Sequence, residues 1–171
     1  MRLYTKVAYN TIFQFISKTI TTILGLVAIA IMARVLGQYG FGEYAIIMAF
    51  LSFFAVLADM GLTLVTTRII SEKGADQDKV LNNLFTFRFF SALIFLGLAP
   101  FSVFLFPYTL VVKIGVIIAS LSFFFIALNQ VFVGFFQKQL RMDKVSIAEV
   151  VSRIFLVAGI ASLMLFPVSN A

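Results

Sequence analysis

The chain has 171 residues, of which 62% are hydrophobic, 22 are phenylalanine and only 12% are charged. A soluble domain carries about 25% charged residues, so this composition predicts an integral membrane protein. The absence of cysteine and histidine excludes disulfides, thiol nucleophiles, Ser-His-Asp triads and the usual zinc sites. The formal net charge is +6, which by itself would also fit nucleic-acid binding.

The first apolar segment, residues 10–36, follows Arg2 and Lys6. It is longer than the apolar core of a secretory signal, which runs about 7 to 15 residues, so we expect a retained membrane helix. Further segments of the length that a spanning helix needs, about 20 residues, follow in order at 40–62, 81–106, 109–136 and 145–168. These runs are continuous rather than alternating, which favours helices over a barrel. We therefore predict an all-α membrane protein with about five transmembrane helices in a single, partial domain, 1–171.

Glycine and proline mark the expected helix ends. Gly37 is predicted to stop the first helix, and Gly40 and Gly42 to let the chain reverse tightly into the second. No strand precedes these glycines, so they do not predict a phosphate-binding loop. Pro100 is expected to kink the third helix, and Pro107 to begin a tight turn into the fourth.

The positions of lysine and arginine predict the orientation in the membrane. Ten basic residues lie outside the apolar segments or at their ends, and eight of them fall on the side of the N-terminus, against only Arg34 and Lys113 on the other side. Because basic residues concentrate in cytoplasmic segments, we predict a cytoplasmic N-terminus and an external C-terminus. The basic excess is thus mainly a topology signal, and no nucleic-acid partner is expected.

The other three basic residues, Lys18, Arg88 and Arg153, lie inside the first, third and fifth apolar segments. Each is seven or eight residues from the cytoplasmic start of its segment, so all three reach a similar depth of about 10 to 12 Å. A charge at mid-membrane costs at least about 2.5 kcal/mol, and three at one level therefore need an explanation. One explanation is that the long side chains extend back to the inner headgroups.

The alternative explanation is a cationic pocket, open to the cytoplasm, for an anionic headgroup such as a lipid pyrophosphate. Asn10, Gln14 and Lys18 follow one another at intervals of four residues, which places them on one face of a helix that is expected to turn away from lipid. On the fifth segment, Glu149 precedes Arg153 by one turn, in the order that favours an ion pair. Lys18, Gln14, Arg88 and Arg153 are the candidate binding residues.

Other polar residues in the segments are expected to support the structure. Asp59, near the cytoplasmic end of the second helix, is a candidate partner for Arg68 or for the pocket, with a structural role favoured. Asn129 and Gln130 are expected to form hydrogen bonds between helices. Asp76 and Asp78 have the spacing of a metal-binding D-x-D motif, but the loop is too short for a nucleotide-binding domain, so a solvated turn is favoured. No metal site and no cofactor are expected.

The stretch "TILGLVAIAIMARVLGQYGFGEYAIIMAF", followed by "LADMGL" and "RIIS", resembles the start of the polysaccharide-biosynthesis flippases, the Wzx-like oligosaccharide transporters. The recurring pattern is matched at 33–37, 40–45, 59–62 and Arg68, and the resemblance is clearest over residues 10–72. These proteins belong to the MOP superfamily with the lipid II flippases and the MATE multidrug exporters. The resemblance implies the N-terminal lobe of a two-lobed transporter, without enzymatic activity, in a bacterial or archaeal cytoplasmic membrane.

The resemblance also implies a substrate, polyprenyl-pyrophosphate-linked oligosaccharide, moved across the membrane for O-antigen or other polysaccharide biosynthesis. The resemblance to lipid II flippases also implies a cavity lined with basic residues, and Lys18 is a residue of this type. Five helices make less than one lobe, and alternating access needs two bundles. We therefore expect a partial chain, or association with further helices or with a second copy. The alternatives are a MATE-like exporter fragment and a membrane scaffold or subunit that transports nothing.

Overall fold

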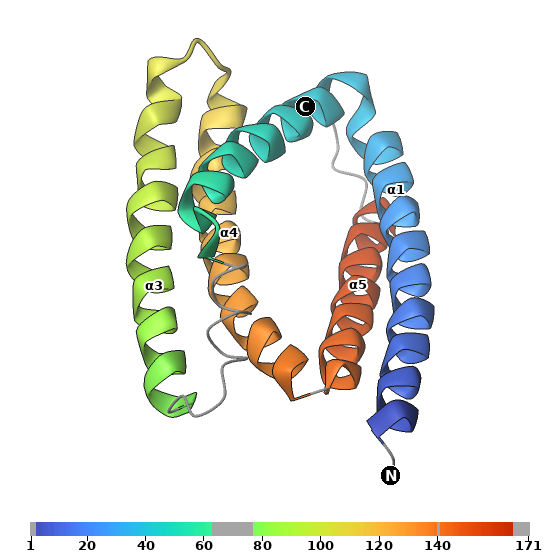
Figure 1. Cartoon of the computed structure of the whole chain (residues 1–171). Helices are drawn as coiled ribbons and strands as arrows, with labels where there is room; N and C mark the ends of the chain where they lie inside the picture. Colours follow the sequence, from blue (N-terminus) through green and yellow to red (C-terminus); the bar gives the residue numbers. More distant parts are fainter. Residues whose placement is uncertain (1–2, 63–76, 140, 166–171) are drawn as a thin grey trace. The chain divides into compact units, whose positions relative to one another are not determined.

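The computed structural model describes residues 3–62, 77–139 and 141–165, and over these ranges the chain forms helices and no strand (Figure 1). The elements in order are α1 (Leu3–Asp59), α3 (Gln77–Ser102), the short 3₁₀ helix η1 (Val103–Leu105), α4 (Leu110–Lys138) and α5 (Met142–Leu165). The four α-helices are all long and apolar enough to cross a membrane. The predicted all-helical class is confirmed for the described residues, with four helices able to span a membrane where about five were predicted. Arg68 and Asp76 lie outside the described residues.

Helix α1 is interrupted once, at Gly37. Its apolar part, Asn10–Asp59, has 50 residues, which at 1.5 Å per residue would extend about 75 Å, against a hydrocarbon core of about 30 Å. Gly37 has φ 67° and ψ −177°, outside the helical region, and so ends one helical stretch and begins another. The predicted stop at Gly37 is confirmed. The predicted turn at Gly40 and Gly42 is wrong, because both lie in helical backbone after the break.

The break at Gly37 allows a test of whether the backbone conformation at this residue requires glycine. The conformation at this residue is essentially restricted to glycine, so Gly37→Ala is expected to lower the free energy of unfolding by about 1 to 3 kcal/mol. A Cβ at this position meets no atom within 4 Å, so the expected loss is conformational rather than steric. The measurement is an SDS titration in detergent micelles followed by circular dichroism. Gly42→Ala is the control, since it is helical and equally open, and equal losses in the two variants would contradict the expectation.

The two prolines that the sequence analysis named lie in the last turn of α3 and in the turn that follows it. Pro100 lies within the last turn of α3, which ends at Ser102 and continues as η1. The chain then passes through Pro107, and α4 begins after Thr109, whose hydroxyl accepts the backbone N–H of Val112 at 3.4 Å. This hydroxyl also donates to Glu43 Oε1 at 2.6 Å, which ties the turn to α1.

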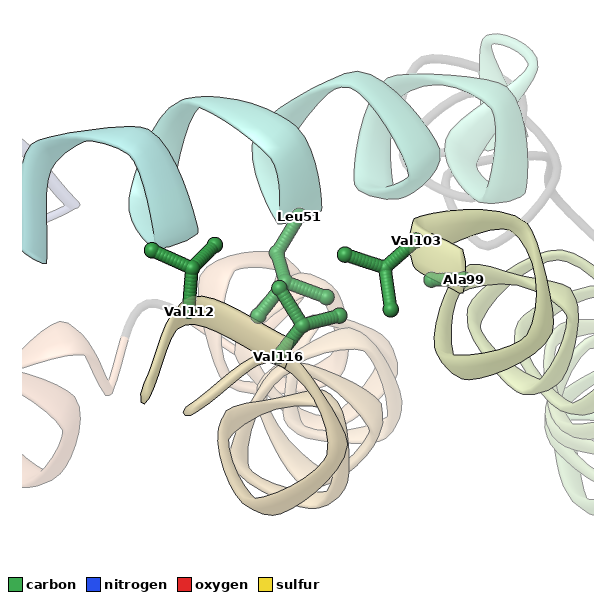
Figure 2. Close-up of a cluster of buried hydrophobic side chains, with 5 residues drawn as sticks. All are labelled: Leu51, Ala99, Val103, Val112 and Val116. Carbon is green, nitrogen blue, oxygen red and sulfur yellow. The ribbon is translucent and has the colours of Figure 1, made fainter. Parts of the chain in front are cut away.

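The chain divides into two compact units, Met1–Phe41 with Gln139–Ala171, and Gly42–Lys138. We refer to them as the α1–α5 unit and the three-helix unit. In the three-helix unit, the second part of α1 packs on α3, η1 and α4 around fully buried aliphatic side chains (Figure 2). These are Leu51, Ala99, Val103, Val112 and Val116, each no more than 1% exposed.

Small residues allow close approach inside the three-helix unit. A Cβ built on Gly115 of α4 would overlap the Cδ1 atom of Ile47, so the α1 side chain occupies the space that a larger residue would fill. A second buried cluster contains Ala58, Ala92, Leu96 and Ala127. Alanine and glycine at such contacts bring helix backbones together, which is the usual basis of helix association in a membrane. The close approach makes backbone carbonyls of α1 and α4 accessible to side chains of α3.

Candidate functional site

Arg88 joins the three helices of the three-helix unit. It is only 5% exposed, and its Nη1 forms an ion pair with Oδ1 of Asp59, the last residue of α1. Its Nε donates a hydrogen bond of 3.0 Å to the backbone carbonyl of Ala127, on α4. One guanidinium group therefore contacts α1 and α4 from a position on α3.

A second polar contact lies beside this one. The hydroxyl of Ser91, one turn along α3 from Arg88, donates to the carbonyl of Ala58 at 2.7 Å and is buried. We call Asp59, Arg88 and Ser91, with the carbonyls of Ala58 and Ala127, the Arg88 cluster. Ala58 and Ala127 belong with Ala92 to one buried apolar cluster, in which each alanine is at most 8% exposed. Burial of an arginine in apolar surroundings is tolerated when its charge and its N–H groups have such partners.

The end of α1 places the carboxylate of Asp59. Met60 and Gly61 both have positive φ, 40° and 79°, so the helix cannot continue past Asp59. The N–H of Met60 still bonds to the carbonyl of Val56 at 3.1 Å, which holds the last turn closed. The Asp59 side chain remains one-third exposed, and it borders an open hollow. The other described residues around the hollow are Ser52, Ala55, Val56, Met60 and Gly61.

Lys18 and Gln14 lie one turn apart on α1, in the α1–α5 unit, and they differ in exposure. Lys18 is exposed, and within the described residues its side chain makes no hydrogen bond or ion pair. Gln14 is half-buried. The buried positions of this part of α1 are Asn10, Ser17, Thr21 and Ala28, which are separated by seven, four and seven residues. Lys18 lies outside this buried face, and its expected position in a cationic pocket stays a prediction.

Arg153 and Glu149 lie on α5 in the same unit, and both are exposed. No ion pair joins these two described residues, although their spacing is suitable for one. Ser146, one turn before Glu149, is buried at 5% exposure. The packed face of α5 thus passes through Ser146, and Arg153 keeps an uncompensated charge in the part of the chain that the structure describes.

Of the six candidate residues, the structure brings together Arg88 and Asp59. Lys18, Gln14, Glu149 and Arg153 belong to the other unit, and within the described ranges no hydrogen bond or ion pair joins their side chains to one another. The sequence analysis did not identify the carbonyls of Ala58 and Ala127 as hydrogen-bond acceptors. Every residue has a backbone carbonyl, so residue type does not show which one is used. The described residues contain no group of three carboxylates placed to hold a metal ion.

A family model described as "Polysaccharide biosynthesis protein" matches residues 7–169, which is nearly the whole chain. No curated protein and no solved structure matches. The matched range includes every candidate residue of both units.

Proposed function

Because the chain belongs to the polysaccharide biosynthesis protein family, the family of Wzx-like flippases in the MOP superfamily, we propose that it acts in a flippase for lipid-linked oligosaccharide. The substrate would be a polyprenyl-pyrophosphate oligosaccharide, moved across a bacterial or archaeal cytoplasmic membrane. The observation that carries the proposal is the family match over residues 7–169, combined with helices able to span a membrane.

The two units supply different parts of this function. Lys18 and Arg153 are exposed cations without a partner among the described residues, so they are the groups available to a pyrophosphate. Arg88 has its charge compensated by Asp59, and we assign it to holding the three-helix unit together. Gln14, half-buried beside Lys18 on α1, is assigned to orienting the headgroup. Glu149 limits the positive charge near Arg153.

The topology is part of the proposal. The break at Gly37 divides α1 into stretches that are each long enough to cross a bilayer, which together with α3, α4 and α5 supports a proposal of five crossings. The basic residues then place the N-terminus in the cytoplasm. In the proposed function these helices work against a second bundle, because alternating access moves one bundle against another.

Deletion of the gene is the test of the proposed function. We expect loss of the surface polysaccharide and accumulation of its lipid-linked repeat unit, measured by immunoblotting of cells and mass spectrometry of lipid extracts. Complementation with the intact gene is the control. Unchanged polysaccharide together with raised sensitivity to cationic dyes would instead identify a multidrug exporter. Unchanged polysaccharide and unchanged dye sensitivity would favour a scaffold.

A further inference from the structure

Asn129 and Gln130 are consecutive amide side chains of α4, and both are exposed. Neither makes a hydrogen bond with another described residue, so the expected bonds between helices do not form within the described ranges. The middle of α4 (Leu110–Lys138) is residue 124, which places Asn129 about 8 Å from the middle of the helix, within the half-thickness of about 15 Å of the hydrocarbon core. Because hydrocarbon cannot satisfy an amide, Asn129 needs a polar partner.

Asn129 lies on the side of α4 opposite the packed one. Ala127 and Val131 are 8% and 2% exposed, and they belong to the face of α4 that packs inside the three-helix unit. At 100° per residue, Asn129 is about 160° around the helix from each of them. Gln130 is about 100° around the helix from Asn129 and lies on its flank. The packed face of α4 therefore supplies no partner for Asn129.

Asn129 is part of a regular row of side chains on the outer side of α4. The row alternates intervals of four and three residues, so every member lies within about 60° of Asn129 around the helix. Its members are Ile118, Ser122, Phe125, Asn129, Phe132 and Phe136. Five of them are exposed, and Phe136 is half-buried. We call these six residues the Asn129 stripe. Their spacing is that of a coiled-coil seam, the geometry by which most membrane helices pack on one another.

A second copy of the chain offers Asn129 a complementary partner. Copies of one membrane protein share an orientation in the membrane, so the Asn129 side chains of two copies lie at the same depth. Each amide has both N–H donors and a carbonyl acceptor, so the two side chains can donate to and accept from each other. A two-fold axis along the membrane normal brings the same face of both copies together. A single asparagine in such a seam also fixes the register of the two helices.

We propose that two copies of the chain associate through the Asn129 stripe, with the two Asn129 amides hydrogen-bonded to each other. The phenylalanines of the stripe pack along the same seam, where aromatic contacts add to the association. This inference goes beyond the proposed function, because it assigns a partner to a face of α4 that the transport of a lipid does not use.

Cysteine cross-linking in membrane vesicles tests which face meets the second copy. The chain has no cysteine, so a single introduced cysteine can form a disulfide only with another chain. Ser122→Cys places a thiol on the Asn129 stripe, and we expect oxidation by copper phenanthroline to give a product of twice the mass of the chain. The matched control is Ser120→Cys, because Ser120 is half-buried and about 160° around the same helix from Ser122. We expect little product from this control.

A second experiment tests the role of the Asn129 amide. Energy transfer between fluorescently labelled copies of the full-length chain, in liposomes of increasing lipid content, measures their association. Asn129→Leu keeps the side-chain size and removes the hydrogen bonds, and we expect it to weaken association about three- to thirtyfold. Gln130→Leu makes the same change one residue along, outside the stripe, and is expected to associate like the parent.

Three results would overturn the inference. The first is equal cross-linking of Ser122→Cys and Ser120→Cys, and the second is a Ser122→Cys product whose mass shows a different protein. The third is Asn129→Leu that associates like the parent. The cross-linking variants keep Asn129, so their result does not depend on the folding of the leucine variant. Neither experiment uses a substrate, so failure of the inference is distinct from failure of the proposed function.

Discussion

Asp59→Asn is expected to lower the free energy of unfolding of the three-helix unit by about 3 kcal/mol. The substitution keeps the shape of the side chain but removes the negative charge, so Arg88 stays buried at 5% exposure without a counter-charge. Breaking a buried ion pair by removing one partner costs about 3 to 5 kcal/mol, and the lower figure applies because Asp59 is one-third exposed. An SDS titration in micelles, followed by circular dichroism, measures the change.

A second substitution separates the charge from the packing. Arg88→Met removes the cation and fills similar volume, so the double variant Asp59→Asn, Arg88→Met is expected to be more stable than Asp59→Asn alone. The control is Glu149→Gln, an exposed acid with no ion pair to Arg153 in the described structure, which is expected to change stability by less than about 0.5 kcal/mol. A double variant as unstable as the single one would show that the ion pair is not the cause.

Lys18→Ala is expected to abolish most of the surface polysaccharide while leaving expression and stability unchanged. Lys18 is exposed and makes no hydrogen bond or ion pair with another described residue, so its removal costs the fold little. Loss of a charged hydrogen bond to a pyrophosphate weakens binding by about ten- to a hundredfold. Immunoblotting of polysaccharide in complemented deletion cells and binding of undecaprenyl pyrophosphate in nanodiscs provide the two measurements.

The control for Lys18 is Arg34→Ala, which removes another exposed cation from the same unit. Arg34 is predicted to lie near the external end of α1, so the control is expected to keep the polysaccharide. Lys18→Arg retains the charge and is expected to restore much of the binding. Normal polysaccharide in Lys18→Ala cells would exclude Lys18 from the binding site.

Local chemistry made parts of the fold predictable. The apolar runs are long enough to identify membrane helices, and the break at Gly37 and the turn at Pro107 follow from residues whose backbone preferences are strong. The role of Arg88 was not predictable, because its partners lie 29 and 39 residues away and one of them is a backbone carbonyl. A sequence shows that a buried charge needs a partner, but packing decides which one.

The exposure of Lys18 shows a second limit. A row of residues at intervals of four drifts around a helix, whereas two packed helices meet along a seam with a period near seven residues. Asn10 and Ser17 are seven residues apart and are both buried, whereas Lys18, one residue beyond Ser17, is exposed. The four-residue spacing of the polar residues therefore identified a helix with polar side chains, but it did not predict which of these side chains would be exposed.

The order of the Arg88 cluster along the chain has a consequence for biosynthesis. An arginine entering lipid alone costs at least about 2.5 kcal/mol, but Asp59 precedes Arg88 and is already available when α3 leaves the ribosome. The carbonyl of Ala127 follows 39 residues later, about 2 to 8 seconds at ordinary rates of synthesis. Asp59 can therefore pair with Arg88 as α3 enters the bilayer, and α4 adds the carbonyl of Ala127 after insertion has begun.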